Sequence, residues 1–281
     1  MRIFVCACYP GFTPYGKKVL SMRSYTFAKL IALGFLAGWF PSAARAHFGM
    51  IIPSFSIVME PEDDPLVVRL SFSHPMEQVG MAMARPRKVW VSANGAAEDA
   101  TDALRPIQLM NHGAWEFEYA PKRPGVYALI VEPEPYFEPA EGIFIIHYAK
   151  TYVAAFGGDG GWHEPVGLPT EIVPLTRPFG NYVSNVFQGL VLSGGKPVPH
   201  AHVEVAHHNE GRLYAAPNGQ MTTQVVKADA NGVFSYGVPF AGWWGFAALS
   251  LSDETMVFDG EEREVELGAV LWAEFVSPIR R

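Results

Sequence analysis

The chain has 281 residues, a net charge of −7 at pH 7, 49% hydrophobic residues and two cysteines. Both cysteines lie within the first eight residues, so the remaining chain has no thiol for disulfides or thiolate metal sites. Such an acidic chain is not expected to bind nucleic acid, whereas it is compatible with collecting cations.

The first 46 residues carry the three parts of a secretory signal peptide. A short basic region precedes an apolar run at 30–40, and the segment closes with Ala44-Arg45-Ala46. The apolar run is too short for a membrane-spanning helix, which needs about 20 residues. We therefore expect translation to start at Met22, cleavage to follow Ala46, and the protein to be exported to the periplasm. Cleavage would leave 235 residues and, by removing six basic residues, change the net charge from −7 to −13.

Short β-branched and aromatic runs recur between Pro, Gly, Asn and Asp turns in residues 47–156. This pattern is typical of an antiparallel β-sandwich. Trp115, Phe117 and Tyr119 alternate with smaller or charged residues, so we expect the three rings on one face of a strand. The other expected strands are 66–72, 88–91, 125–131 and 143–148. We therefore predict a first, Ig-like β-sandwich over residues 47–156.

Residues 157–181 differ in composition from the segments on either side. Gly157-Gly158-Asp159-Gly160-Gly161 indicates a flexible loop, and four prolines stiffen the remainder. The segment also contains Trp162, Leu168, Ile172 and Val173. We therefore expect an irregular connection packed on the surface rather than a free linker.

Residues 182–281 are predicted to form a second, smaller sandwich. Expected strands at 186–192, 199–205 and 233–236 are separated by a Gly-Lys-Pro-Val-Pro turn and by a turn containing Asn231-Gly232, a strong tight-turn dipeptide. This order resembles the carboxypeptidase-regulatory-like or transthyretin-like module, which is usually structural. The sequence thus predicts an all-β fold with two β-sandwich domains.

All nine histidines lie after residue 46. His47 would be the first residue after cleavage, and an N-terminal histidine can chelate one metal ion with its α-amine and its imidazole Nδ1. Imidazole suits Ni, Cu, Zn and Fe. The alternative is that histidine follows the cleavage site by chance, and that interpretation would prevail if His47 stood alone.

Two further histidines become candidates if the fold brings them close to His47. His74 ends an expected strand beside Pro75 and Met76, and it is either an exposed ligand or an ordinary turn residue. His147 ends an apolar strand, where a lone histidine is more often a satisfied core residue.

The remaining histidines carry weaker signals. His200 and His202 alternate along an expected strand and would share one face, and His207 and His208 follow closely. A polar outer face of the second sandwich is favoured over a chelating pair, and the roles of these four residues stay open. His112 fits a hairpin turn.

Several long motifs of the chain resemble one known family. They are Ala46 to Ser54, Phe72 to Glu77, Lys122 to Tyr127, Val131 to Glu141, Phe144 to Tyr148, Pro165 to Pro178, and Gly268 to Trp272. The chain from His47 to Phe275 is similar to the periplasmic component of energy-coupling-factor-type nickel/cobalt uptake systems (NikK-type), a family known by an unknown-function domain. One departure is His163, since an acidic residue is common at that position.

The resemblance implies a periplasmic protein that captures Ni²⁺ or Co²⁺ and passes it to a membrane transporter of the energy-coupling-factor type. His47, His74 and His147 stand in the matching motifs and carry over as the metal ligands. Ni²⁺ is the leading metal, with Co²⁺ and Cu²⁺ left open, because affinity order alone does not separate them.

The sequence favours a non-enzymatic protein, because it has no nucleophile elbow, phosphate loop or dinucleotide fingerprint. An alternative function is a structural or adhesive module that binds a protein or glycan, with Trp243-Trp244 and Tyr136-Phe137 as an exposed contact surface. A weaker alternative is an enzyme with a copper site at its N-terminal histidine.

Overall fold

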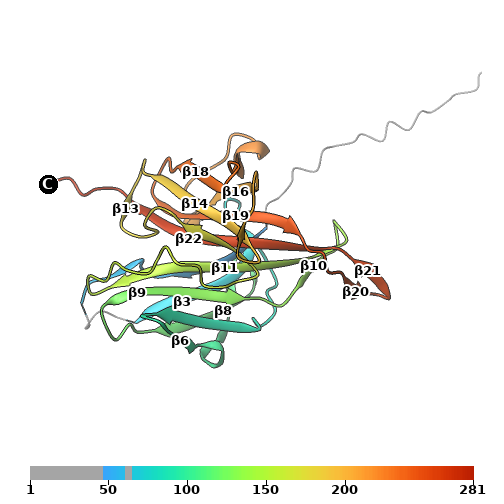
Figure 1. The fold of residues 1–281 in the computed structure, drawn as a ribbon, viewed down its shortest axis with the longest axis horizontal. Coiled ribbons are helices and arrows are strands. Elements are labelled where there is room, and N and C mark those ends of the chain that lie inside the picture. The colour runs from blue at the N-terminus through green and yellow to red at the C-terminus, as the bar shows by residue number, and fades with distance from the viewer. Residues whose placement is uncertain (1–46, 61–64) are drawn as a thin grey trace, which may run out of the picture. The chain divides into compact units, whose positions relative to one another are not determined.

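The computed structural model describes residues 47–60 and 65–281, which form β-strands, turns and three short 3-10 helices (Figure 1). The predicted signal peptide lies outside the described residues. Within them the strands make three sheets and one separate hairpin. This arrangement confirms the prediction of an all-β sandwich fold. No helix of the described part is long and apolar enough to span a membrane.

The three sheets are named here by their place in the chain. The N-terminal sheet contains β1 (Phe48–Pro53), β3 (Leu66–His74), β4 (Val79–Met81), β7 (Arg105–Leu109) and β8 (His112–Tyr119). The C-terminal sheet contains β12 (Thr170–Pro174), β14 (Val186–Ser193), β15 (Lys196–Pro197) and β18 (Val233–Gly237).

The central sheet is the largest and takes strands from both ends of the chain. It contains β2 (Ile57–Val58), β5 (Lys88–Ala93), β6 (Ala96–Asp99), β9 (Gly125–Glu132), β10 (Tyr136–Glu138), β11 (Ile143–Ala155), β13 (Asn181–Tyr182), β16 (His202–His207), β17 (Gln224–Lys227), β19 (Gly242–Leu251) and β22 (Val265–Val276). The remaining elements are the hairpin of β20 (Met256–Phe258) and β21 (Glu261–Arg263) and the 3-10 helices η1 (Thr101–Ala103), η2 (Glu210–Arg212) and η3 (Gly219–Met221).

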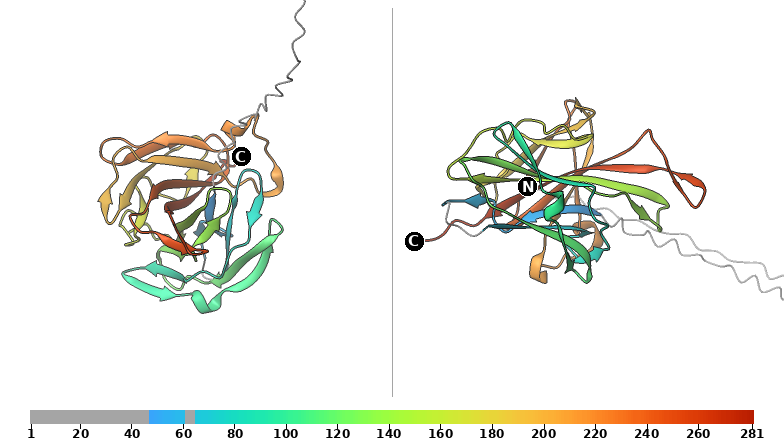
Figure 2. Two further views of the ribbon diagram at one scale, coloured as in Figure 1. Left: turned by 90° about the vertical axis from the view of Figure 1, so that its right-hand side faces the viewer. Right: turned by 90° about the horizontal axis from the view of Figure 1, so that it is seen from below.

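Two hydrophobic cores lie on the two faces of the central sheet. Phe48 and Phe117 pack with Trp272 in the core beneath the N-terminal sheet. Phe187 and Phe246 belong to the second core, beneath the C-terminal sheet. Figure 2 (left) shows the red strand β22 between the cyan-to-green strands on one side and the yellow-to-orange strands on the other. The molecule is therefore layered, with the central sheet shared by both cores.

The parallel pairing of β11 with β22 joins the two halves of the chain. Phe144 to Thr151 lie beside Val265 to Trp272 in register. Because layers cover both faces, β11 is buried almost continuously rather than at alternate positions. The two predicted sandwiches, 47–156 and 182–281, thus share one sheet.

The segment predicted to be an irregular connection contributes a strand of the C-terminal sheet. β12 is buried along its whole length and pairs with β14, so the prediction is wrong for residues 170–174. Glu171 on β12 accepts a hydrogen bond of 2.6 Å from the buried Lys150 of β11. Glu171 also accepts from the backbone N–H groups of Val166 and Gly167. This buried pair fastens the segment to the central sheet, since removing either partner would strand a buried charge.

The structure contradicts the prediction that Trp243 and Trp244 form an exposed contact surface. Both side chains lie on β19 and are buried, at 9% and 3% exposure. Phe137 is half-buried and stacks on Phe258 of the β20–β21 hairpin, with ring centroids 3.8 Å apart. Packing within the molecule therefore accounts for these aromatic residues.

Candidate functional site

The three histidines selected from the sequence lie in one neighbourhood. His47 directly precedes β1, and His74 is the last residue of β3. These strands are antiparallel with Phe48 opposite Ser73, so the next pair outward is His47 and His74. Their ring centroids are 4.7 Å apart. His147 comes from β11, in the central sheet.

Phe72 is the ring around which this neighbourhood is built. His47 stacks on it at 5.6 Å and an interplanar angle of 17°. His147 meets it edge-on at 5.5 Å and 80°. Phe72 itself is buried, so it fixes both rings from the side of the N-terminal sheet. Sequence reasoning missed this role, because the alternation of β3 marks Phe72 only as a core residue.

Two glycines make room for the ring of His147. Gly268 lies opposite His147 in the parallel β11–β22 pair, and a Cβ there would fall 2.2 Å from His147 Cδ2. A Cβ at Gly49 would fall 2.9 Å from His147 Cβ. Real Cβ atoms do not come this close to a buried ring, so both positions need glycine.

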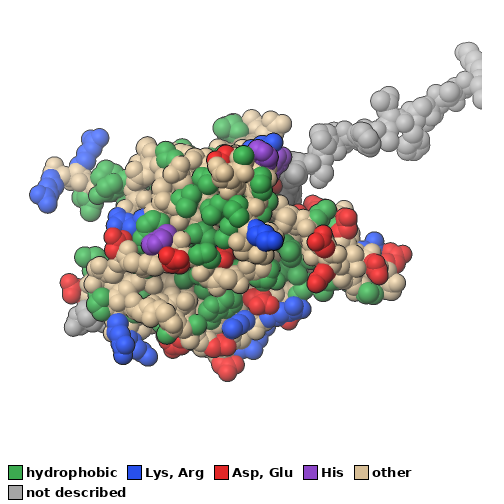
Figure 3. All heavy atoms as spheres, viewed as in Figure 1, with side chains coloured by type: hydrophobic (Ala, Val, Ile, Leu, Met, Phe, Trp, Pro, Cys, Tyr) green, Lys and Arg blue, Asp and Glu red, His purple; other side chains and the backbone are tan. Residues whose placement is uncertain are grey.

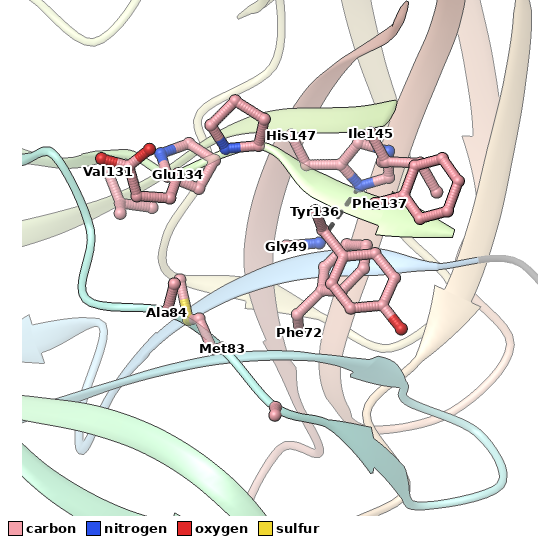
Figure 4. Close-up of a pocket in the computed structure, with 13 residues that line it drawn as sticks. Gly49, Phe72, Met83, Ala84, Val131, Glu134, Tyr136, Phe137, Ile145 and His147 are labelled. Carbon is pink, nitrogen blue, oxygen red and sulfur yellow. Dashed lines mark hydrogen bonds between the residues drawn. The ribbon is translucent and has the colours of Figure 1, made fainter. Parts of the chain in front are cut away.

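The backbone of Gly49 decides which nitrogen of His147 carries the proton. Its N–H donates to His147 Nδ1 at 3.2 Å, drawn as the dashed line in Figure 4. A neutral imidazole that accepts at Nδ1 is protonated at Nε2. Among the described residues Nε2 has no hydrogen-bond partner, and Oε1 of Glu266 lies 3.7 Å away. His147 therefore points an N–H toward a carboxylate.

His47 carries its proton on the same nitrogen as His147, but its Nε2 is paired with a carboxylate. Its Nε2 lies 3.1 Å from Oε2 of Glu138, at the end of β10. Burial lowers the pKa of His47, and the neighbouring Glu138 acts in the other direction. A neutral ring that donates from Nε2 to a carboxylate keeps a lone pair on Nδ1. Nδ1 is the nitrogen that an N-terminal chelate would use.

Two carboxylates interact with these histidines and two more interact with those carboxylates, and none of the four was selected from the sequence. Glu138 and Glu266 both act electrostatically on His47. Burial raises the pKa of Glu204 to about 7, with further contributions from Glu266 and Glu141. Figure 3 shows acidic side chains grouped at the end of the molecule where β10, β20 and β21 lie. Negative potential at this end favours the approach of a cation.

A cavity of about 230 Å³ reaches the inner side of the site. Gly49, Phe72, Tyr136 and His147 line its inner part, where Figure 4 shows them coming together from separate strands. Met83 lies on the opposite wall. The cavity gives small molecules access to a histidine that is only 2% exposed.

The neighbourhood is not a preformed coordination shell. Across residues 47–60 and 65–281, no three His, Cys, Asp or Glu side chains stand at metal-binding spacing. A cleaved chain would add the α-amine of His47, which is not a side-chain donor.

The other histidines divide into exposed and buried ones. His200 lies in a turn before β16 with a φ of 59°, so it does not share a strand face with the exposed His202. His207 is 5% exposed and His208 is largely buried, which contradicts a polar outer face. His112 follows the tight turn between β7 and β8, as predicted.

Comparison with protein families gives one match, to a family described as a domain of unknown function (DUF4198), over residues 44–252. The chain belongs to this family. A comparison with curated proteins gives no match.

The chain is also similar to several solved structures. The adhesin InvE of Yersinia pseudotuberculosis is 9% identical with a TM-score of 0.22, over 79% of this chain and 58% of that one. A putative carbohydrate binding protein from Bacteroides uniformis is 13% identical with a TM-score of 0.23, over 80% of this chain and 100% of that one. The FN1-FN3 domains of chicken CNTN1 are 12% identical with a TM-score of 0.19, over 83% and 68%. Scores this low carry no information on function.

Proposed function

We propose that the processed chain is a non-enzymatic, periplasmic metal-binding protein that captures Ni²⁺, or Co²⁺, at His47, His74 and His147. It would then pass the ion to a membrane uptake system of the energy-coupling-factor type. One observation supports the proposal: the rings of His47 and His147 both contact Phe72, and His74 lies beside His47, although the three histidines are 27 and 73 positions apart in the sequence. These three histidines also stand in the motifs that resemble the nickel/cobalt uptake family.

His47 is the central ligand of this proposal. After cleavage it supplies two donors, the α-amine and Nδ1, and its Nε2 is already held by Glu138. His74 lies next to it and supplies a third nitrogen. Nitrogen donors without thiolates suit Ni(II), and the acidic surroundings balance its charge.

His147 must change its protonation to become a ligand. Ligation through Nε2 requires the proton to move to Nδ1, and this ends the hydrogen bond from the Gly49 N–H. Metal binding should therefore shift the backbone amide signal of Gly49 in NMR spectra. If the ring signals of His47 and His74 respond while Gly49 does not, His147 is not a ligand.

Calorimetry of Ni²⁺ binding tests the capture step. The proteins are the chain beginning at His47, the same chain preceded by one alanine, and His47→Ala, with His202→Ala as the exposed-histidine control. Loss of the chelate should weaken binding on the order of 100-fold, equal to about 2.8 kcal/mol. Equal affinity in all four proteins would rule the site out.

The delivery step has its own readout in cells that make this protein. Deleting the gene, or replacing His47 by alanine, should lower nickel accumulation, and His202→Ala should not. Normal accumulation in the deletion strain would remove the transport role while leaving capture intact.

A further inference from the structure

Another histidine-lined cavity, of about 140 Å³, lies beside the C-terminal core. Its wall includes His207 at the end of β16, Phe240 and Trp244 near the start of β19, and Tyr214 and Met221 from the loop between β16 and β17. Met76, from the turn after β3, completes it. None of the described lining residues carries a carboxylate.

His207 presents a lone pair in this region. A Cβ at Gly242 would fall 2.5 Å from His207 Nε2, so Nε2 faces the backbone at residues 241–242. There the ring is hydrogen-bonded to the backbone of Ala241, an interaction that favours the protonated nitrogen. Nδ1 is buried and has no partner in the described part of the chain. A histidine that donates one N–H to a backbone carbonyl and keeps its other nitrogen free is arranged as a metal ligand.

Asn209 holds the methionine side of the cavity in place. Its Nδ2 donates to the carbonyl oxygens of Met76 at 3.0 Å and Tyr214 at 2.7 Å. Its Oδ1 accepts from the Tyr214 N–H at 3.0 Å. Asn209 is 2% exposed, so these bonds are shielded from water. The turn that carries Met76 is thereby tied to the loop that faces His207.

Aromatic rings surround His207. Phe240, Trp244 and Tyr214 have centroids 4.8, 5.1 and 5.4 Å from the imidazole. Tyr214 and Phe240 stack on each other at 4.5 Å. The faces of such rings attract a cation that enters without its water shell.

We propose that this cavity binds a soft monovalent cation, Cu(I), through His207 Nδ1 and the thioether sulfurs of Met76 and Met221. Thioether and imidazole donors select Cu(I), whereas a site without carboxylates offers little to Ni²⁺. This site is separate from the one at His47 and does not depend on it.

Titration with Ag(I), an air-stable analogue, and with Cu(I) under anaerobic competition with a chromogenic chelator tests the proposal. The chain beginning at His47 and its His47→Ala variant should both bind one ion with quenching of tryptophan fluorescence. Absence of this ion from His47→Ala would overturn the proposal.

Methionine variants show whether the sulfurs are ligands. Met76→Leu and Met221→Leu conserve volume, and Met221 is 50% exposed, so neither change threatens the fold. Each should weaken Ag(I) and Cu(I) binding about tenfold or more. Met110→Leu, in a different cavity, is the matched control and should bind as the unmodified chain does. Unchanged affinity in both Met76→Leu and Met221→Leu would also overturn the proposal.

Discussion

His147 and His207 are alike in type and burial, but their surroundings prepare them for opposite roles. Both lie on strands of the central sheet, and each has one ring nitrogen without a partner in the described part of the chain. Gly49 donates to Nδ1 of His147, so the unpartnered Nε2 carries a proton and faces Glu266. The ring of His207 is bonded to the backbone of Ala241, so its unpartnered Nδ1 is a lone pair.

The difference shows that the backbone group bonded to a buried imidazole decides which of its ring nitrogens carries the proton. An N–H at one nitrogen places the proton on the other, and a carbonyl does the reverse. The site at His47 must therefore rearrange at His147 before it closes around an ion. The cavity at His207 needs no change of protonation. The four predictions below test this contrast, from the largest expected effect to the smallest.

Gly268→Ala should have the largest effect. Its Cβ would enter the space of the His147 ring, at 2.2 Å from Cδ2. Overpacking of a buried position should cost about 3 kcal/mol of unfolding free energy, measured by urea denaturation. Ni²⁺ binding should fall with it, because His147 is displaced, while Ag(I) binding at His207 should persist.

Gly113→Ala is the control for this change. Gly113 also lies on a strand, and no described atom is within 4 Å of the position of its Cβ. We expect its stability to stay within about 0.5 kcal/mol of the unmodified chain. Equal costs for both variants would show that the loss at Gly268 has nothing to do with His147.

Acid should destabilise the protein through His207 and His208. Burial lowers the pKa of each to about 4, against about 6.5 in an unfolded chain. Between these values the unfolded chain takes up protons that the folded chain does not, so stability falls as pH decreases from 6.5 to 4. Glu204, with a pKa raised to about 7, acts in the opposite direction.

Urea denaturation at pH 7.5, 6 and 4.5 measures this dependence. His208→Gln should remove about 2 kcal/mol of the loss, after allowance for its partial exposure. His202→Gln, at an exposed position, should leave the curve unchanged. A His208→Gln curve that has the same pH dependence as that of the unmodified protein would contradict the buried, neutral state of this imidazole.

Local sequence signals predicted the strands well but not their assembly. The expected strands 66–72, 125–131 and 186–192 appear as β3, β9 and β14 with nearly the same ends. Each is bounded by Pro, Gly or Asn residues, which indicate turns. The long strands β19 and β22 and the parallel β11–β22 pairing were missed, because strand pairing over more than a hundred residues leaves no local pattern.

The candidate site was also predictable only where local signals sufficed. His47, His74 and His147 carry side-chain chemistry and stand in long motifs, so they could be named in advance. Glu138, Glu266 and Gly268 join the site only through pairing and register. The role of His207 stayed open in the sequence; it lies five positions after the exposed His202 on β16, so the two side chains point to opposite faces and His207 is buried.

The two sites should respond differently to pH. The α-amine of His47 has an expected pKa near 7.7–8.0, and metal binding must displace its proton. Ni²⁺ affinity should fall about 30-fold from pH 7.5 to 6, because each pH unit below the amine pKa costs about tenfold. Protonation of the His47 imidazole adds little to this loss of affinity above pH 6.5, since burial lowers the pKa of the imidazole.

At His207 the imidazole pKa is about 4, so Ag(I) affinity should stay constant over the same range. The measurement is competition titration of both ions at four pH values. A parallel decline at the two sites would show that His207 is not the preset ligand described above.

Glu138→Ala should produce the smallest effect and only at the first site. Glu138 holds Nε2 of His47 at 3.1 Å and so keeps the lone pair on Nδ1. Losing such a partner of a ligating histidine should lower Ni²⁺ affinity about tenfold. Glu134→Ala, whose carboxylate pairs with the exposed Arg87, removes the same charge and should have little effect.

Glu138→Gln separates orientation from charge. Its amide oxygen can still accept from Nε2, so it should recover part of the affinity lost in Glu138→Ala if hydrogen bonding fixes the ring. If Gln is no better than Ala, the carboxylate acts through its charge alone. The tautomer of His47 would then be unconstrained before metal binding, unlike those of His147 and His207, which backbone groups set.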